Sequence, residues 1–367
     1  MKLVLEKRPR QSAAMSLFSP FLALALTTLT GALLFSLRGL EPLGALYIYF
    51  IEPVASLWSI EELVVKVVPL VLIGTGLAMG YKANVWNIGA EGQLIMGALA
   101  GSLIPVYFPA WQSPLGLVFM LVLAMTGGAL YGAIPALLKN RFGVNEILTS
   151  LMLVYVAQLF LDWLVRGPWR DPHGYNFPKS ITFEGWQLLP TLGNSRVHLG
   201  AFFAIIAVLA AALIMSRTIK GFEIRVIGKS PRAGLFSGFS KDRIVMFSFI
   251  FTGALAGLAG ICEVAGPVGQ LQPSISPGYG FTAIIVAFLG RLNPFGVLFA
   301  GILLAISYLG GESLQISMGV SAKITQVFQG VLLFYVLACD TLIHYRIRLL
   351  RPQRALAGAV ESSHGRV

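Results

Sequence analysis

Charged side chains are scarce in this chain, since Asp, Glu, Lys and Arg make up only 12% of its 367 residues. A soluble domain carries about 25%, so half of the charge that a water-facing surface needs is missing. Cysteine is also scarce: Cys262 and Cys339 lie far apart in apolar segments, with no disulfide or zinc spacing. The four histidines are scattered, and the sequence holds no Ser/His/Asp set, no paired carboxylates and no HExxH motif. The composition excludes a soluble domain and gives no support to a membrane enzyme, and we expect neither a metal nor a cofactor.

Long apolar segments are what the sequence has instead, and hydrophobic residues make up 56% of it. A helix needs about 20 apolar residues to cross a bilayer. The first segment is longer than the apolar core of a signal peptide and no cleavage site follows it, so we interpret it as a retained first span. We predict an all-α integral membrane protein with about ten transmembrane helices, at residues 15–37, 62–80, 88–108, 114–138, 143–164, 198–216, 243–264, 281–291, 294–310 and 323–341.

The net charge of +11 is distributed unevenly along these predicted spans. With the N-terminus inside, 20 of the 27 Lys and Arg residues fall in cytoplasmic segments and 6 fall on the opposite side. This asymmetry is what the positive-inside rule predicts. We therefore place both termini in the cytoplasm, attribute the basic charge to topology and membrane lipid, and expect no nucleic-acid partner.

The predicted spans divide into two halves of five helices that enter the membrane in opposite senses. Transporters are often built from such inverted repeats, with broken helices at matching positions beside the substrate path. Gly-rich polar junctions lie between the second and third helix of each half, at residues 81–93 and 263–280. The predicted organisation is a cytoplasmic tail (1–14), a first half (15–164), an extracytoplasmic loop (165–197), a second half (198–341) with a cytoplasmic loop (217–242), and a basic cytoplasmic tail (342–367).

Glycines spaced four apart predict close helix packing. The pairs are Gly76/Gly80, Gly97/Gly101, Gly128/Gly132 and Gly253/Gly257. In lipid such spacings let two helix backbones approach one another, so they indicate a packed bundle and no particular function.

Residues 87–93, with the sequence Asn-Ile-Gly-Ala-Glu-Gly-Gln, are the strongest local signal. A carboxylate and two amides at the edge of an apolar helix are costly in lipid, so they face protein or a water-filled path. Glu91 could carry an ion, contact substrate, or accept hydrogen bonds from N–H groups freed by Gly89 and Gly92. We take Asn87, Glu91 and Gln93 as candidates for the substrate path.

Three further polar residues complete the predicted path. Asn145 and Glu146 open the fifth helix, where Asn145 could cap it and Glu146 could interact with the helix dipole. Lining of the path is the alternative for both. Glu263, with Gln326 and Gln329, is an intramembrane polar residue that could line a path or bond to a neighbouring helix.

The cytoplasmic loop predicts a short helix. Gly228-Lys229-Ser230 resembles the end of a phosphate-binding loop, but the required earlier glycine is replaced by Glu223, so we reject nucleotide binding. Ser230 suits an N-cap, Pro231 the first helical position and Gly238 the position after the C-cap. The intervening segment has a small apolar face that could dock on a cytoplasmic partner or rest on the membrane surface.

Four ordered motifs resemble those of one known family. Residues 87–101 and 144–153 are similar to stretches in the permease subunits of ABC importers for nucleosides, simple sugars and branched-chain amino acids. Residues 221–233 resemble the coupling segment of that family, and residues 289–296 its Gly-rich turn. The chain resembles most the longer permease of nucleoside importers, although Val154 stands where a polar Asn is expected.

The resemblance implies a mechanism and partners. Two permeases, identical or homologous, would form the path with a type II ABC importer-like fold in a prokaryotic inner or plasma membrane. Cytoplasmic ABC ATPase subunits would hydrolyse ATP, so this chain would be no enzyme, and an extracytoplasmic binding protein would deliver substrate. The ATPases would dock around Gly221, Glu223, Arg225, Gly228, Ser230, Pro231, Arg232, Leu235 and Phe236.

The main alternative is an ion-coupled secondary transporter that uses Glu91 or Glu263. Such a protein needs neither a docking helix nor an ATPase. For an importer, nucleosides are the first expected substrate class, ribose-like sugars the second and branched-chain amino acids the third.

Overall fold

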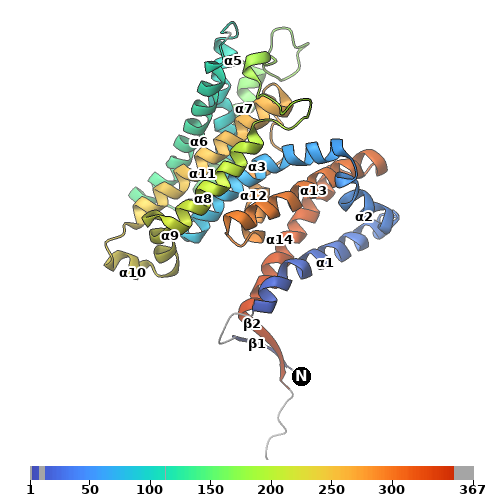
Figure 1. Ribbon diagram of the computed structural model, residues 1–367, viewed down its shortest axis with the longest axis vertical. Coiled ribbons are helices and arrows are strands. Elements are labelled where there is room, and N and C mark those ends of the chain that lie inside the picture. The colour runs from blue at the N-terminus through green and yellow to red at the C-terminus, as the bar shows by residue number, and fades with distance from the viewer. Residues whose placement is uncertain (1, 8–12, 112, 351–367) are drawn as a thin grey trace, which may run out of the picture. The chain divides into compact units, whose positions relative to one another are not determined.

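The computed structural model describes residues 2–7, 13–111 and 113–350. The chain forms two compact units (Figure 1). One consists of residues 31–330, and the other combines the chain ends, residues 1–30 with 331–367. Helices α1 (Ala13–Leu37) and α14 (Ala322–His344) each run from one unit into the other.

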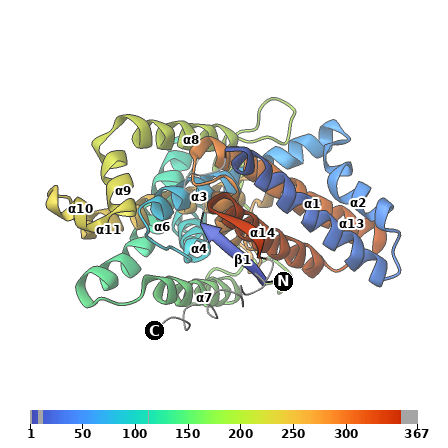
Figure 2. The same cartoon turned by 90° about the horizontal axis from the view of Figure 1, so that it is seen from below.

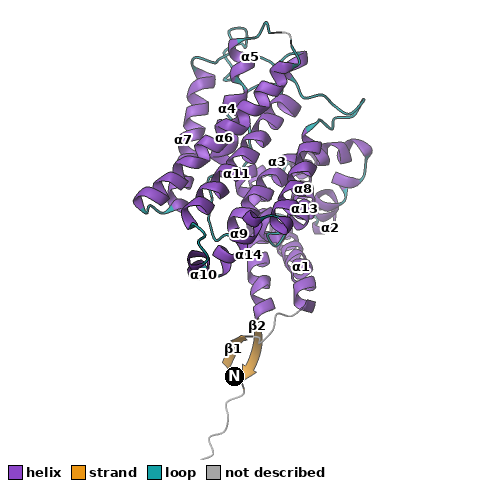
Figure 3. Cartoon of the chain, turned by 60° about the vertical axis from the view of Figure 1, so that its left-hand side comes forward, coloured by secondary structure: helices purple, strands orange, loops and turns teal. Residues whose placement is uncertain are grey.

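The unit of the chain ends contains a small sheet that the sequence analysis did not predict. Strand β1 (Lys2–Lys7) pairs antiparallel with β2 (Tyr345–Leu350), with Lys2 opposite Leu350 and Lys7 opposite Tyr345 (Figure 3). In the same unit the hydroxyl groups of Thr30 and Tyr335 are 3.0 Å apart. Parts of both predicted tails are thus strands, which corrects the all-α prediction in this detail. Pairing joins residues more than 330 positions apart, so no local pattern signals it.

The regular elements within residues 31–330 are helices, joined by loops. Every one of the ten ranges predicted between residues 15 and 341 overlaps a helix. The elements are α2 (Pro42–Phe50), η1 (Glu52–Val54), α3 (Leu57–Lys82), α4 (Ala90–Gly101), α5 (Leu103–Tyr107), α6 (Leu115–Phe142), α7 (Glu146–Arg166), η2 (Gly185–Gln187), α8 (Gly200–Arg217), α9 (Ile219–Lys229), α10 (Pro231–Phe236), α11 (Lys241–Glu263), the π-helical η3 (Val264–Val268), α12 (Tyr279–Leu289) and α13 (Pro294–Met318).

Six described helices are long and apolar enough to cross a membrane: α3, α6, α7, α8, α11 with η3, and α13. Helices α4 and α12 have only 12 and 11 residues. At 1.5 Å per residue each is about 17 Å long, roughly half of the hydrocarbon thickness. The predicted helix at 88–108 is interrupted at Ser102, because Pro105 has no N–H to donate to the carbonyl four residues earlier.

The interior of this unit lies around α3. Of the 18-residue apolar stretch that qualifies α3 as a membrane span, 89% is buried. Seen from below, α3 and α4 lie between α7 on one side and α8 on the other (Figure 2). The predicted glycine contacts are confirmed where α4, α6 and α11 meet. A side chain at Gly97 would collide with Gly257, and one at Gly128 with the Gly253 carbonyl. These glycines therefore bring three helix backbones together.

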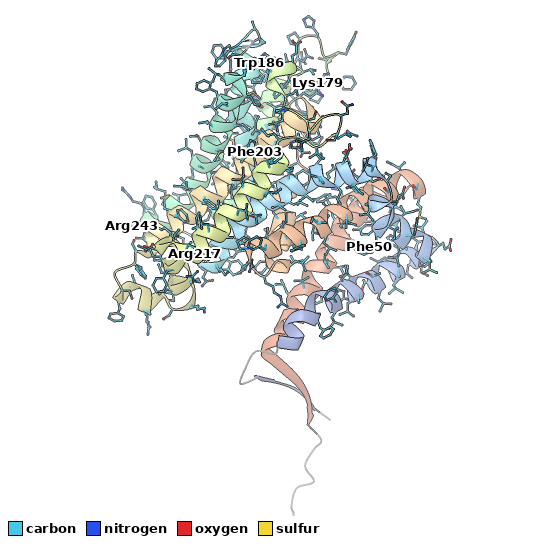
Figure 4. All side chains as sticks on the ribbon, viewed as in Figure 1. Phe50, Lys179, Trp186, Phe203, Arg217 and Arg243 are labelled. Carbon is cyan, nitrogen blue, oxygen red and sulfur yellow. The ribbon has the colours of Figure 1, made fainter. Side chains whose placement is uncertain are left out.

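The two ends of the bundle differ in charge and composition. Helix α5 and the loop 167–199 lie at one end, and α9 and α10 lie at the other (Figure 1). Lys179 and Trp186 are at the first end, while Arg217 and Arg243 are at the second (Figure 4). The loops predicted as outer and inner thus lie at opposite ends of the bundle, and the side of the membrane that each one faces stays a prediction.

The loop 167–199 hydrogen-bonds to the non-helical segment that follows α11. Ser180 N and Phe183 N donate to the carbonyls of Leu271 and Gly269 at 2.9 and 2.8 Å, and Leu189 N donates to Ala265 O at 2.8 Å. Non-helical backbone at membrane depth is tolerated only where protein or water satisfies it. The loop supplies that pairing, and so allows the polypeptide to leave α11 and start again as α12.

Candidate functional site

The two short helices α4 and α12 meet at their N-terminal ends. Glu91, in the first turn of α4, is 1% exposed, and its Oε2 accepts a hydrogen bond from Gly280 N of α12 at 2.6 Å. The Ser276 hydroxyl is a second donor to this carboxylate. A side chain at Gly280 would collide with the backbone of Glu91, so only glycine allows this contact.

This geometry gives Glu91 a structural partner. The first N–H groups of a helix have no partner within it, and a carboxylate is favoured there by the helix dipole. One of the three roles that the sequence left open for Glu91 was to accept hydrogen bonds from N–H groups freed by Gly89 and Gly92. Glu91 serves instead the first turn of α12, 189 residues away in sequence. A role in the path stays a prediction.

Asn87 and Gln93 form a closed pair of amides. Asn87 Nδ2 donates to Gln93 Oε1 at 3.0 Å, and Gln93 Nε2 donates to Asn87 Oδ1 at 3.3 Å. Asn87 Oδ1 also accepts from Gly89 N at 2.9 Å, and the Tyr81 hydroxyl donates to Asn87 O at 2.9 Å. Both side chains are buried. The pair holds the turn between α3 and α4, and a role of Asn87 and Gln93 in the path stays a prediction.

Glu263 ends α11, where the π-helix begins. Its Oε1 accepts from the Tyr279 hydroxyl at 3.4 Å. Lys66 of α3 is among its charged neighbours and forms an ion pair with Glu312 of α13 at 3.1 Å. Charged or phenolic groups from four helices therefore gather beside the segment that follows α11.

A polar cluster on α12, α13 and α14 adjoins this region. The Tyr308 and Thr282 hydroxyl oxygens are 2.8 Å apart, and Thr282 donates to Gln329 Oε1 at 3.2 Å. The rings of Tyr279 and Tyr308 meet edge to face, with 5.4 Å between centroids. Our sequence reasoning noted Gln329 but missed Thr282 and Tyr308, because tyrosine and threonine inside apolar helices give no distinct pattern.

Asn145 and Glu146 lie at the turn between α6 and α7. Asn145 Oδ1 accepts from Ile147 N at 2.9 Å, so the predicted N-cap is confirmed. Glu146 forms an ion pair with Lys139. These partners are local, and among the described residues no hydrogen bond or ion pair joins Asn145 or Glu146 to Glu91 or Glu263. A path-lining role for Asn145 and Glu146 stays a prediction.

Helix α9 is attached firmly to the transmembrane helices. Ile224 and Ile227 are buried in an apolar cluster with residues of α3, α6, α8 and α11. A side chain at Gly228 would collide with the Lys82 carbonyl at the end of α3, and one at Gly221 with the end of α8. The Arg225 guanidinium donates to the Met215 carbonyl. Our sequence analysis treated this stretch as loop.

The outward side of α9 carries both apolar and charged residues, with Ile219 74% and Phe222 52% exposed. Glu223 pairs with Lys220 at 2.7 Å, one turn earlier on the helix. The predicted coupling residues Gly221, Arg225 and Gly228 therefore anchor the segment, while the Glu223 side chain is 16% exposed.

Helix α10 has the capped form that the sequence predicts. Ser230 occupies the N-cap position without a side-chain cap bond, and Pro231 is the first helical residue. Gly238 has φ +79°, and Phe239 N donates to Gly234 O at 3.0 Å, which is a Schellman ending. Leu235 is 61% exposed and Phe236 is 94% exposed. Arg232 is also exposed, so α10 presents an apolar tip beside a cation.

The opposite end carries a polar hollow beside α3. Arg196 pairs with Glu62 at 3.3 Å, and its backbone N–H donates to Glu61 at 3.0 Å. Burial lowers the pKa of His198 to about 4, and His198 Nδ1 accepts from Gly200 N at 3.1 Å. A cavity of about 270 Å³ is lined by Glu62, Val65, Leu189, Thr191, Ser195, Arg196, His198, Gly266 and Pro267.

Comparisons with known proteins agree with these features. Residues 59–337 match the family described as branched-chain amino acid transport system / permease component. A glucose ABC transporter permease protein of Haloferax volcanii is 33% identical over all of this chain and 98% of its own length. A nucleoside ABC transporter permease protein of Lactococcus lactis is 28% identical, over 86% of this chain and 89% of its own. A guanosine ABC transporter permease protein of Bacillus subtilis is also 28% identical, over 87% and 92%.

Proposed function

Since the chain belongs to the family of branched-chain amino acid transport system permease components, we propose that it forms the translocation path of an ATP-driven importer for nucleosides or related simple sugars. It is a permease subunit of an ABC transporter and a multi-pass membrane protein, and ATP hydrolysis belongs to separate subunits. This family membership favours the ABC permease over the ion-coupled secondary transporter.

Ten crossings in two inverted halves, with both termini cytoplasmic in a cell inner membrane, are the topology that we propose. The six long apolar helices supply six of them. Helices α1 and α14 supply the first and last. Helix α4 with α5, and α12 with the segment 264–278 before it, supply the remaining two. The meeting of α4 and α12 through Glu91 and Gly280 supports this arrangement, because each follows the second helix of its half.

The cytoplasmic ATPases would dock on α10. Support comes from its exposed apolar tip at Leu235 and Phe236, together with the buried attachment of α9 to α3. Gly228 contacts the Lys82 carbonyl where α3 ends, and the next ordered helix begins beside Glu91. A displacement of α10 by its partner would therefore pass through α9 to the junction of α4 and α12.

Nucleosides or simple sugars are the proposed substrates because named relatives transport both. A glucose permease is more identical to this chain than the two nucleoside and guanosine permeases above. The polar cluster of Thr282, Tyr308 and Gln329 suits the ring hydroxyls that both classes share. A second permease and an extracytoplasmic binding protein complete the proposed assembly.

The test is gentle detergent extraction of the tagged chain from its native membrane, followed by mass spectrometry. We expect an ABC ATPase to co-purify, and the reconstituted complex to take up a nucleoside or sugar only with ATP and binding protein. Recovery of the chain alone, with uptake driven by an ion gradient, would overturn the proposal.

A matched pair of variants sharpens the docking step. Phe236 and Tyr175 are 94% and 93% exposed, on the inner and outer loops. We expect Phe236→Ala to weaken ATPase binding about thirtyfold and to lower ATPase recovery accordingly, because a buried aromatic anchor is worth about 2 kcal/mol or more at an interface and 1.4 kcal/mol is tenfold. Tyr175→Ala should leave recovery unchanged. Equal recovery with Phe236→Ala would show that α10 is not the docking element.

A further inference from the structure

The amide of Gln329 is half satisfied inside the protein. Gln329 is 4% exposed, and its Oε1 accepts from the Thr282 hydroxyl at 3.2 Å. Its Nε2 is buried and has no hydrogen-bond partner among the described residues. An unpaired buried polar group is costly to folding, so the position needs an explanation.

Reversal of the amide does not satisfy all of its donors. Oxygen and nitrogen of a Gln side chain are assigned from the hydrogen-bond network, and the Tyr308 hydroxyl is a hydrogen-bonding neighbour of Gln329 besides Thr282. The amide carries one acceptor oxygen and two N–H donors. Thr282 and Tyr308 can satisfy the oxygen and one N–H in either orientation, so one N–H donor is left without a partner in this cluster.

The neighbours of this amide are groups that bind polyhydroxylated rings. Thr282 connects Gln329 to the Tyr308 hydroxyl at 2.8 Å, and the ring of Tyr308 lies against that of Tyr279. Sugar hydroxyls both donate and accept hydrogen bonds, and the ring faces carry C–H groups that pack on aromatic rings. An amide, two hydroxyls and two aromatic rings offer partners to both parts of such a ligand.

We propose that Gln329, supported by Thr282 and Tyr308, recognises a ring hydroxyl of the substrate as the sugar moiety passes through this permease. The inference rests on the proposed function and names the contact that would make it selective. The N–H donor that Thr282 and Tyr308 leave unpaired is the group that the substrate hydroxyl would satisfy. Ribose of a nucleoside and a free hexose present the same chemistry, so the experiment distinguishes these sources.

The test uses the complete complex of permease, ATPase and binding protein in liposomes. Initial ATP-driven uptake is measured for a ribonucleoside against its 2′-deoxy and 3′-deoxy analogues, and for glucose against 2-deoxyglucose. The affinity of the binding protein for each compound is measured separately, and each uptake rate is corrected for it, so that the remaining selectivity belongs to the permease. We expect Gln329→Leu to reduce uptake of the hydroxylated substrate about tenfold and uptake of one deoxy analogue much less, because a site built to bond a hydroxyl discriminates by that bond.

A matched control lies one turn earlier on α14. Gln326 is exposed, and its Oε1 accepts from Lys323 Nζ at 3.3 Å. Gln326→Leu should leave the selectivity unchanged, and Gln329→Asn, which keeps an amide, should restore part of it. Gln329→Leu should also be no less thermally stable than the wild type, since it removes a polar group that the protein does not satisfy.

The outcomes separate this inference from the proposed function. Unchanged selectivity in Gln329→Leu, or an equal loss in Gln326→Leu, would overturn the inference while importer function stands. A loss of selectivity together with a large loss of thermal stability would assign Gln329 a structural role instead. ATP-driven uptake of neither compound class by the wild type would overturn the proposed function and this inference with it.

Discussion

Glu91 is a residue that hydrogen-bonds α4 to α12, two helices far apart in the sequence. Its carboxylate is the hydrogen-bond acceptor for the first turn of α12. A carboxylate that binds backbone N–H groups at a helix start has a local structural effect and also fixes how two helices cross. We therefore expect substitutions of Glu91 to change the stability of the protein, whether or not they also change transport.

We expect Glu91→Leu to lower the free energy of unfolding by about 1–3 kcal/mol, because Gly280 N–H loses its buried acceptor. Glu91→Gln keeps an acceptor oxygen and should retain most of the stability. Thermal unfolding of the purified protein in nanodiscs measures both. Glu312→Leu is the control, since its carboxylate is half exposed and an exposed ion pair contributes at most about 1 kcal/mol. Equal stability of Glu91→Leu and Glu312→Leu would contradict the capping role.

Single-residue predictions from the sequence succeeded where the partner is local. The cap by Asn145 and the positions of Pro231 and Gly238 follow from residues within one or two turns. The partner of Glu91 lies 189 residues away, and nothing in either segment identifies the other. Thr282 and Tyr308 were missed because threonine and tyrosine inside apolar helices give no distinct sequence pattern.

Glycine contacts decide packing at the scale of whole helices. Helix α11 crosses α4 and α6 with Gly257 at the contact, where a side chain would collide with the Ala124 carbonyl and the Gly128 backbone. Gly330 in α14 has no atom within 4 Å of the position that a Cβ would take. The two glycines therefore make a matched pair.

We expect Gly257→Ala to separate the helices and cost about 1–3 kcal/mol or more, as overpacking against backbone does. Gly330→Ala should be neutral or stabilising by up to about 1 kcal/mol, because alanine is the better helix former. Folded yield and melting temperature after detergent extraction measure the difference. Tolerance of Gly257→Ala would mean that the three backbones are farther apart than described.

Elements were predicted from the sequence more reliably than their lengths. All ten predicted ranges contain helix because long apolar segments leave few alternatives. The short α2 and the amphipathic α9 were missed, since neither is long enough to give a span signal. The interruption at Ser102 was missed because Pro105 lies inside an otherwise continuous apolar segment.

The arrangement of the whole chain across the membrane can be tested with two exposed aromatic residues. Tyr175 and Phe236 lie at opposite ends of the bundle, and the native Cys262 and Cys339 are both buried. We expect Tyr175→Cys to react with a membrane-impermeant thiol reagent in intact cells. Phe236→Cys, which a docked ATPase would cover, should react only after permeabilisation of cells that lack the ATPase subunits. Labelling of both from outside would exclude the proposed orientation.

Pairing of β1 with β2 limits how the chain can be threaded through a membrane. The strands hydrogen-bond along six residue pairs, so Lys2–Lys7 and Tyr345–Leu350 must occupy the same aqueous compartment. A chain that starts and finishes on one side has made an even number of passages. An odd number of membrane crossings between β1 and β2 is therefore excluded. If one more segment is assigned as a crossing, a second segment must be added or removed as well.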